Sequence, residues 1–221
     1  KTGQTTHGAV ILGQDVLITC DPDNLKAVLA TKFDDFSLGP RITAYGCLLG
    51  RGIFTADDVH WEHSRSLIRP SFTKQQVSDL ERIEFHLERL MAKIPGDGTT
   101  VDLQPLFFNF TVDRATEFLF GHSLNTQISP PGSESHRFAE AFDHTQVKMQ
   151  NHARLGLLQD LYKLISWDIK LKDDCKFIHA YTDRYIQEAL QAGKREYNSR
   201  AQRYNMLSEL MTACKDPTQL R

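Results

Sequence analysis

Trp61 and Arg65 stand four residues apart in the segment 57–73, which reads DDVHWEHSRSLIRPSFT. Residues at that spacing lie on one face of a helix. An indole N–H can only donate a hydrogen bond, and a guanidinium carries several donors and stays charged. Together the two side chains suit an anion, above all a carboxylate. The structural alternative is that Trp61 packs in a core while Arg65 pairs with a surface acid, and the spacing alone leaves both interpretations open.

Two histidines in the same segment could ligate a metal. His60 and His63 are three residues apart and therefore neighbours on a helix. The spacing HExxH is absent, because Glu62 directly precedes His63, and no cysteine or third ligand lies nearby in the sequence. Solvated or hydrogen-bonded histidines are the simpler interpretation.

A modest basic patch is formed by Arg65, Arg69 and Lys74. It is either a solvated helix face or a docking surface for an acidic protein partner. The net charge of the whole chain is −2, so no overall positive field favours nucleic acid or acidic lipid.

The composition is that of an ordinary globular protein. Of the 221 residues, 40% are hydrophobic and 10% aromatic, which is enough for a sizeable core in one large domain or in part of a bigger one. The cysteines Cys20, Cys47, Cys175 and Cys214 are widely spaced and form no CxxC pair, so they predict neither a zinc site nor a disulfide framework. A reduced compartment follows as the default expectation.

No stretch of about 18 apolar residues is present, so the sequence predicts no membrane-spanning helix. The chain starts at Lys1 and stops just after an amphipathic helix. We expect it to be an internal piece of a longer reading frame, with segments on both sides.

The elements that would position these residues begin with a β-hairpin. AVILG and VLITC are short β-type runs separated by Gly13-Gln14-Asp15. Asp21 is suited to be the N-cap of a helix with Pro22 in its first turn, and this helix should end near Lys32. The glycine-rich run ITAYGCLLGRGIF predicts a loop with a helical turn, and from about Ala56 the pattern is almost wholly helical.

Several helices are predicted after this point. Asp57 or Asp58 can cap the first, and Pro70 should end or kink it. Residues 101–121 are dense in Leu, Phe and Val, which predicts a deeply buried helix ending at Gly121. We expect a break near residues 172–173 before one long polar helix. Residues 74–94 show helical spacing of the apolar positions Val77, Leu80, Ile83, Leu87, Leu90 and Met91.

The segment GRGIFTADDVHWEHSRSLIRPSFT resembles the third main helix of the cytochromes P450, which carries a W-x-x-x-R motif. DPDNLKAVLATKFDDFSLGPR resembles the family's preceding helix and the loop that enters the substrate region. VDLQPLFFNFTVDRATEFLFGHSLN resembles its buried fifth helix. These segments follow one another in the family's order over essentially the whole chain, and the sequence is most similar to the fungal alkane- and fatty-acid-hydroxylating branch.

The resemblance implies a mainly α fold with a small N-terminal β-hairpin, the N-terminal part of the cytochrome P450 fold. Residues 1–221 would be a partial domain, with a hairpin at 1–20, a helix and substrate-region loop at 21–55 and a helical part at 56–221. The family's cysteine-ligand loop, its E-x-x-R helix and its long acid–Thr helix have no counterpart here, so we expect the C-terminal haem-thiolate portion to lie outside this chain.

The resemblance also assigns residues. Trp61 and Arg65 would donate to a propionate of the haem, which is the implied cofactor. Tyr45, Ile53 and Phe54 fall in the region that lines the substrate pocket, and residues 138–169 would form the roof over the substrate channel.

On the proximal side, Arg69 and Lys74 would face the reductase. No residue of this chain is expected to be catalytic or to ligate a metal.

The implied parent inserts one atom of molecular oxygen into an aliphatic substrate, with electrons from an NADPH-dependent flavin reductase. It would act at the cytosolic face of the endoplasmic reticulum membrane, held by an anchor outside this chain. The chain alone is expected to be inactive and not to fold independently. Two other classes stay open, namely a non-enzymatic helical module that binds a lipid or a partner helix, and a metal-dependent enzyme that uses His60 and His63.

Overall fold

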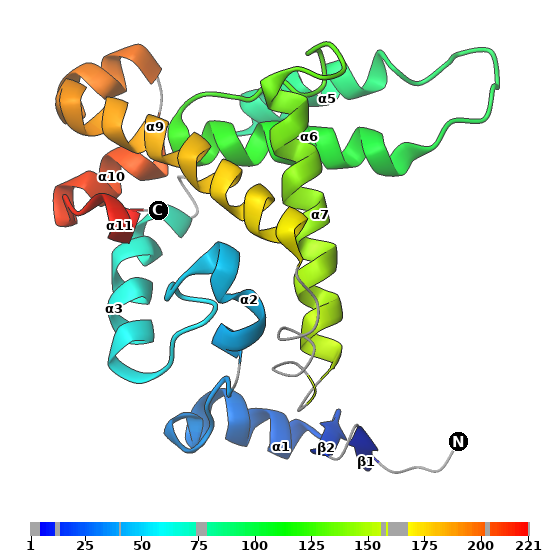
Figure 1. Ribbon diagram of the computed structural model, residues 1–221, viewed down its shortest axis with the longest axis vertical. Helices are drawn as coiled ribbons and strands as arrows, with labels where there is room; N and C mark the ends of the chain where they lie inside the picture. Colours follow the sequence, from blue (N-terminus) through cyan, green and yellow to red (C-terminus); the bar gives the residue numbers. More distant parts are fainter. Residues whose placement is uncertain are drawn as a thin grey trace. The chain divides into compact units, whose positions relative to one another are not determined.

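The computed structural model describes residues 5–11, 14–39, 41–73, 79–155, 158, 168–201 and 204–220 (Figure 1). The chain divides into two compact units. Unit 1 comprises Lys1–Ser64 and Thr145–Asp173, and unit 2 comprises Arg65–His144 and Asp174–Arg221. The fold is mainly helical with a two-stranded sheet near its N-terminus, which confirms the predicted fold class. No helix within these ranges is long and apolar enough to cross a membrane.

Unit 1 begins with the predicted hairpin. Strand β1 (Thr6–Ile11) pairs antiparallel with β2 (Gln14–Thr19), from Thr6 opposite Thr19 to Ile11 opposite Gln14. The facing threonine hydroxyls are 2.8 Å apart, a typical cross-strand pair. Gln14 and Asp15 were predicted in the turn but belong to β2, because this register leaves two residues between the strands. Those two residues lie outside the described ranges.

A capped helical segment follows the hairpin. Helix α1 (Pro22–Lys26) is continued by a π-helical turn, η1 (Ala27–Thr31), and a 3-10 turn, η2 (Phe33–Asp35). The Asp21 carboxylate accepts the N–H groups of Asp23 and Asn24 at 3.0 and 3.2 Å, as an N-cap should. The predicted cap and the predicted end near Lys32 are both confirmed.

The glycine-rich run is more regular than predicted. It forms a nine-residue helix, α2 (Arg41–Leu49), that buries Ala44 and Leu48. Helix α3 (Asp58–Ile68) comes next and passes into a 3-10 turn, η3 (Arg69–Phe72). The α-helix therefore ends just before Pro70, as predicted, because proline has no N–H to continue the ladder.

Unit 2 is built around α6. Helices α5 (Leu80–Met91) and α10 (Met206–Ala213) both pack against α6 (Leu103–Phe120), and α10 also contacts the short α11 (Pro217–Leu220). The Asp102 carboxylate caps α6 through the Gln104 N–H at 3.0 Å. Gly121 ends it, as predicted, at φ 75°, the left-handed conformation common at helix C-termini.

Two long helices, α7 (Glu134–Arg154) and α9 (Ile169–Ala201), contribute residues to both units. The predicted break near residues 172–173 is wrong, since α9 runs through them without interruption. Its irregularity lies instead at Gly193, with φ 73° and ψ 159°. Glycine adopts that conformation readily and other residues do not, whereas lysine and aspartate fit an ordinary helix.

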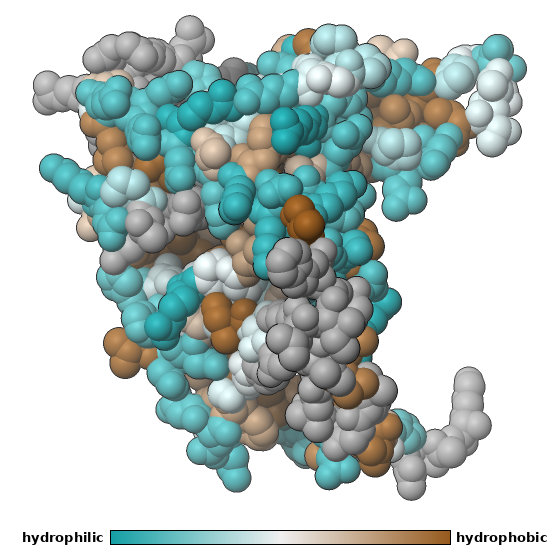
Figure 2. Space-filling model, viewed as in Figure 1, coloured by the Kyte–Doolittle hydropathy of each residue, from teal (hydrophilic) through white to brown (hydrophobic). Residues whose placement is uncertain are grey.

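One apolar cluster of unit 2 lies between α9 and α10. It contains the buried residues Ile186, Ala189, Leu207 and Met211, with Phe120 packed against them. In unit 2 several large apolar side chains remain on the surface, including those of α5 and α6, and brown patches interrupt the hydrophilic face seen in Figure 2.

Two predictions about burial are wrong. Of the α5 positions predicted to form its apolar face, Val77 lies outside the described residues and only Leu90 is buried, whereas Arg82 and His86 occupy the interior. In α6 the buried residues are Val112, Asp113 and Thr116, and the phenylalanines stay partly or largely exposed. A hydrophobic face becomes buried only where another element covers it, and these faces have no such cover within the described residues.

Candidate functional site

Helix α3 places the predicted carboxylate-binding residues one turn apart. Trp61 and Arg65 both lie within its regular stretch. The backbone N–H of Trp61 closes the first turn by donating to the Asp57 carbonyl at 3.3 Å. Trp61 is half-buried and Arg65 is exposed. The helix therefore confirms the geometry that the four-residue spacing predicts, without testing what the two side chains bind.

The surroundings of Trp61 come from distant segments of unit 1. The Phe33 ring of η2 lies 5.0 Å from the indole ring, centroid to centroid, at an interplanar angle of 39°. Asp57, just before α3, accepts the Leu38 N–H at 2.8 Å and so ties the loop after η2 to the start of α3. The Phe33 ring packs against the indole, and the hydrogen bond of Asp57 holds the start of α3 beside the same loop. Neither contact follows from a local sequence pattern.

The pair is chemically suited to a carboxylate of a haem. The N–H groups of both side chains donate hydrogen bonds and accept none, so they complement an anion. An exposed guanidinium one turn from a half-buried indole can reach an anion that lies against the helix, as a propionate would. The donor set thus fits the group that the family resemblance implies.

The predicted substrate region lies in unit 1. Tyr45 is half-buried in α2, whereas Ile53 and Phe54 follow it in the turn before α3, with Phe54 65% exposed. The Thr55 hydroxyl donates to the carbonyls of Gly50 and Gly52 at 2.7 and 3.2 Å, which holds this turn in a defined shape. The structure therefore presents a large apolar side chain on a fixed loop.

The remaining predicted residues are placed as follows. Arg69 is exposed in η3, and Lys74 lies outside the described residues. His60 and His63 are both exposed on α3. Within the part of the chain that the structure describes, no group of three or more His, Cys, Asp or Glu side chains is placed to hold a metal ion.

Sequence reasoning missed a polar network inside unit 2. The ring of His86, which is fully buried in α5, lies 2.9 Å from a carboxylate oxygen of Glu117 in α6. Arg82, 4% exposed, pairs with Asp79 at 3.2 Å and approaches Glu117 at 3.7 Å. The Arg82 guanidinium also donates to the Tyr204 carbonyl at 3.0 Å, just before α10. The sequence signals for it are the four-residue spacing of Arg82 and His86 and the polar residues Asp113, Arg114 and Glu117, which predict a polar stripe or salt bridges in an otherwise apolar helix.

The network sets the ionisation of Glu117. Burial alone would raise the pKa of this carboxyl, but the hydrogen bond with His86 and the charges of Arg82, His86 and Arg114 outweigh burial and hold the pKa below its usual value. The carboxylate form is therefore the one that the network stabilises.

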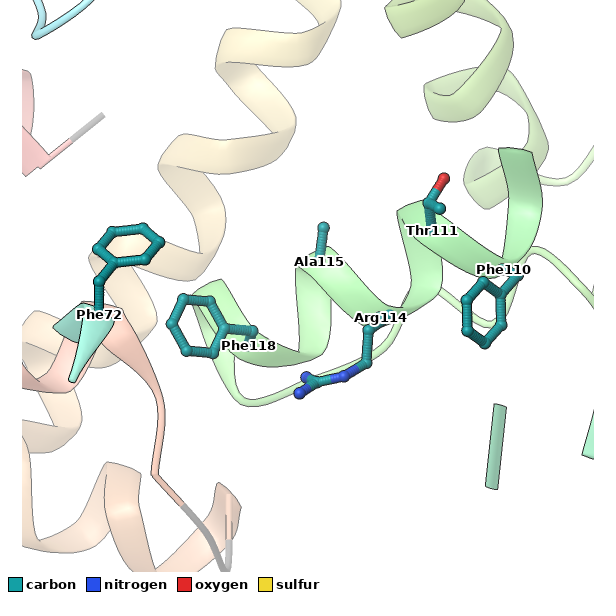
Figure 3. A pocket seen from close by; sticks show the side chains of 6 residues that line it. All are labelled: Phe72, Phe110, Thr111, Arg114, Ala115 and Phe118. Carbon is teal, nitrogen blue, oxygen red and sulfur yellow. The ribbon is translucent and has the colours of Figure 1, made fainter. Parts of the chain in front are cut away.

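A hollow of about 310 Å³ lies along α6 (Figure 3). We call it the α6 hollow. The Phe72 ring of η3 faces Phe118 at its end, with the ring centroids 5.9 Å apart. It is lined by Phe72, Phe110, Thr111, Arg114, Ala115 and Phe118.

Comparison with known proteins connects these features to one family. The model of the family described as Cytochrome P450 matches residues 4–220. Cytochrome P450 monooxygenase g430 of a Fusarium species is 39% identical over 99% of this chain and 41% of its own length. Cytochrome P450 52A9 of Candida maltosa is 41% identical over 94% of this chain and 41% of its own length.

A solved structure gives the same indication at the level of the fold. The crystal structure of a cytochrome P450, CYP102L1, superposes with a TM-score of 0.68 over 98% of this chain and 46% of the other, at 20% sequence identity. The chain thus spans about two-fifths of the length of the curated relatives described above.

Proposed function

The chain belongs to the cytochrome P450 family, and we propose that it is the N-terminal portion of a haem-dependent monooxygenase that hydroxylates aliphatic substrates such as n-alkanes or fatty acids. The observation that carries the proposal is the placement of Trp61 and Arg65 one turn apart on α3, in a chain that matches the family over nearly its whole length. The substrate class rests on the resemblance to the fungal alkane- and fatty-acid-hydroxylating branch.

In this proposal α3 binds the haem through one propionate. Trp61 donates its indole N–H, and its contact with Phe33 limits the directions in which the ring can point. Arg65 supplies a permanent positive charge that offsets the charge of the propionate. When bound, the haem supplies the activation of molecular oxygen, and this chain contributes the positioning of the cofactor.

None of the four cysteines is proposed as the iron ligand. Cys175 is 2% exposed inside the regular stretch of α9, and the family places its thiolate in a glycine- and phenylalanine-rich loop instead. We therefore assign the ligand to the part of the parent outside residues 1–221, and we expect the isolated chain to be inactive.

The test of the α3 assignment is haem retention by the full-length parent. Arg65→Ala should increase the rate of haem loss during dialysis at least about tenfold, because an Arg–carboxylate pair contributes about 1.5–3 kcal/mol. Trp61→Phe keeps the aromatic contact with Phe33 and removes only the N–H, so it should also increase haem loss, by a smaller factor. Arg41→Ala, an exposed arginine of α2, is the matched control and should leave retention unchanged.

Unchanged retention in Arg65→Ala and Trp61→Phe would refute the propionate contact. A loss in Arg65→Ala with none in Trp61→Phe would leave Trp61 as a packing residue only.

The proposed reaction has its own test. The full-length parent, supplied with NADPH and a flavin reductase, should transfer one atom of isotopically labelled dioxygen into a fatty acid or n-alkane, detected by the mass of the alcohol product. Absence of labelled product from a haem-loaded protein with either substrate would contradict the proposed substrate class.

The substrate and reductase residues follow from the same proposal. Phe54→Ala should change the distribution of hydroxylated positions, because it removes a large side chain from the expected pocket region.

Arg69→Glu should raise the KM for reductase with little change in kcat. Arg41→Glu makes the same charge change on α2 and should change neither the KM for reductase nor the kcat. Tyr45 and Ile53 belong to the proposed substrate region together with Phe54, and Lys74 belongs to the proposed reductase surface together with Arg69.

The organisation of the parent is proposed in the same way. Residues 1–221 would be a partial domain of a protein on the cytosolic face of the endoplasmic reticulum membrane, with the membrane anchor outside this chain. Residues 138–169 would cover the substrate channel.

A further inference from the structure

The turn that follows α3 holds the C-terminal end of this helix. None of the residues of α3 is buried, whereas Ser71 in η3 is only 1% exposed. Arg65, which is proposed to bind the haem propionate, lies in the last turn of α3 and belongs to unit 2 together with η3. A helix that buries none of its own residues is positioned by its flanking segments, so the direction of the Arg65 side chain depends on how η3 is anchored.

Three aromatic rings in a row connect η3 with the segment before α10. The Phe72 ring of η3 lies 5.9 Å from the ring of Phe118 in α6, centroid to centroid (Figure 3). The ring of Phe118 lies 6.1 Å from that of Tyr204. Aromatic rings attract one another at separations of about 4.5–7 Å. The rings therefore join the end of α3 to Tyr204 through α6.

Two buried hydroxyls lie close together beside these rings. The Ser71 Oγ and Tyr204 Oη atoms are both buried, and neither makes a well-formed hydrogen bond within the described residues. Burial raises the pKa of the Tyr204 phenol above its usual value, and the neighbouring Ser71 hydroxyl acts in the opposite direction. A hydroxyl can both donate and accept, so the two groups can satisfy each other directly or through one bridging water.

The polar network of unit 2 fixes the backbone of Tyr204. Arg82, 4% exposed, donates to the Tyr204 carbonyl at 3.0 Å. The same guanidinium pairs with Asp79 at 3.2 Å and approaches Glu117 at 3.7 Å. Tyr204 is therefore held in place independently of η3, which makes it suited to support another residue.

We propose that Tyr204 and Ser71 are positioning residues for Arg65. Contact between their hydroxyls fixes η3, and η3 sets the direction in which the last turn of α3 presents the Arg65 guanidinium to the haem propionate. This inference rests on the proposed function and adds to it two residues that act through Arg65. A loose anchor would leave the guanidinium present but misplaced, and an ion pair weakens when its geometry is lost.

The test is haem retention by the full-length parent in a double-mutant cycle. Tyr204→Phe keeps the three rings and removes only the hydroxyl. It should raise the rate of haem loss during dialysis at least about threefold, the usual effect of losing one hydrogen bond between neutral groups. In the Arg65→Ala background the same change should have no further effect, because Tyr204 acts through Arg65. Ser71→Ala, a second variant that removes the other hydroxyl, should behave in the same way in both backgrounds.

The matched control is Tyr181→Phe. Tyr181 is 7% exposed and its hydroxyl lies 3.4 Å from that of Tyr185, so this change also removes a buried phenol hydroxyl from unit 2. It should leave the rate of haem loss unchanged. Equal increases in haem loss in Tyr181→Phe and Tyr204→Phe would overturn the proposal, because general destabilisation would then explain both. Additive effects of Tyr204→Phe and Arg65→Ala would overturn it as well.

Hydrogen exchange measures the anchor itself in the haem-free parent. The backbone N–H groups of residues 65–72 should exchange at least about threefold faster in Tyr204→Phe than in the unmodified protein, because the turn opens more often without the hydroxyl contact. Tyr181→Phe should leave their exchange unchanged. Equal exchange rates in Tyr204→Phe and the unmodified protein would show that the hydroxyl does not hold η3, which would refute the positioning role.

Failure of this inference and failure of the proposed function give different results. Haem loss that rises in Arg65→Ala but stays unchanged in Tyr204→Phe and Ser71→Ala refutes the positioning role alone. Haem loss that stays unchanged in all three variants, with faster exchange of residues 65–72 in Tyr204→Phe, refutes the propionate contact and with it the positioning role, and leaves only the anchor of η3.

Discussion

Two regions of unit 2 lie on different sides of α6 and differ in how far this chain completes them. On the inner side, Arg82 and His86 of α5 meet Glu117, and Asp113 of α6 accepts the Thr126 N–H at 2.6 Å, so the charged groups are paired, while the ring Nδ1 of His86 has no hydrogen bond within the described residues. On the outer side, the aromatic rings of the α6 hollow and of Phe107 remain exposed or half-buried.

The difference shows that the polar and the apolar surface of one helix can be buried by different parts of a protein. The inner network is formed by segments that are present here, from α5 through the residue before α10. The outer face requires a covering element, since apolar area gains stability only when water is removed from it. The predictions below separate the two regions, from the largest expected effect to the smallest.

The largest effect should come from breaking the inner network. Glu117→Leu in the full-length parent should lower the free energy of unfolding by about 4 kcal/mol, because it leaves the buried charge of Arg82 with fewer partners. Urea unfolding measures this loss. The matched control is Glu134→Leu, which breaks the 2.6 Å pair with Arg184, in which both side chains are 53% exposed. That change should stay within about 0.5 kcal/mol, and equal losses in the two variants would show that burial does not matter here.

The outer face gives the next effect. If a helix covers it in the parent, Phe107→Ala should lower the free energy of unfolding by about 3 kcal/mol, the usual result of truncating a buried phenylalanine. Leu80→Ala on α5, where the side chain is 71% exposed, is the control and should change the free energy of unfolding by less than about 0.5 kcal/mol. A change as small at Phe107 as at Leu80 would mean that α6 stays open to water.

Asp113 tests whether the inner side depends on charge as well as shape. Its carboxylate, fully buried, accepts three hydrogen bonds, from the N–H and hydroxyl of Thr126 at 2.6 and 2.8 Å and from the N–H of Gln127 at 3.1 Å. Asp113→Asn keeps the shape of the side chain but replaces one carboxylate oxygen with an NH₂ group. That group then faces an N–H donor of Thr126 or Gln127 instead of accepting from it. The substitution should lower the free energy of unfolding by about 2 kcal/mol, measured by urea unfolding.

The matched change for Asp113 is at an exposed turn. Asp97→Asn alters a carboxylate that accepts the Thr99 N–H at 2.9 Å at the protein surface, and it should have little effect. A loss at Asp113 no larger than that at Asp97 would contradict a role for the buried charge.

Local features of this fold could be predicted from the sequence, whereas burial could not. The cap at Asp21 and the end of α6 at Gly121 depend on a few neighbouring residues, and both predictions are confirmed. The apolar spacing of α5 is equally local, but which face it buries depends on α6 and on the segment before α10. The apolar spacing of α5 carries no information about Glu117 or Tyr204. The polar residues of α6 predict salt bridges, but their pairing with Arg82 and His86 could not be predicted from the sequence.

The candidate site shows the same limit. The motif placed Trp61 and Arg65 on one helix face, and α3 confirms that arrangement. The contact of Trp61 with Phe33 joins residues that are far apart in the chain, and no spacing rule connects them. The proposal that the anion is a haem propionate rests on the family resemblance, and no periodicity in the chain specifies it.

The smallest effect expected is a change in the pH dependence of stability. Burial favours the neutral form of Glu117, but the His86 hydrogen bond and the Arg82 charge outweigh it, so the folded state holds the pKa of Glu117 below its unfolded value of 4.5. A carboxyl with a lowered folded pKa contributes stability that is fully present above the unfolded pKa and is lost as the pH falls through the folded pKa. The contribution should therefore decline progressively as the pH falls below about 4.5.

Urea unfolding of the full-length parent between about pH 6 and about pH 3.5 measures this contribution. Glu117→Gln keeps the size of the side chain and removes its titration, so its stability should fall less steeply with acid than that of the unmodified protein. Carboxyls distant from the network titrate alike in both proteins, so the difference between the two slopes reports Glu117 together with the groups that it contacts. Parallel slopes would mean that the inner network does not favour the charged form, and the contrast between the two sides of α6 would then rest on packing rather than on charge.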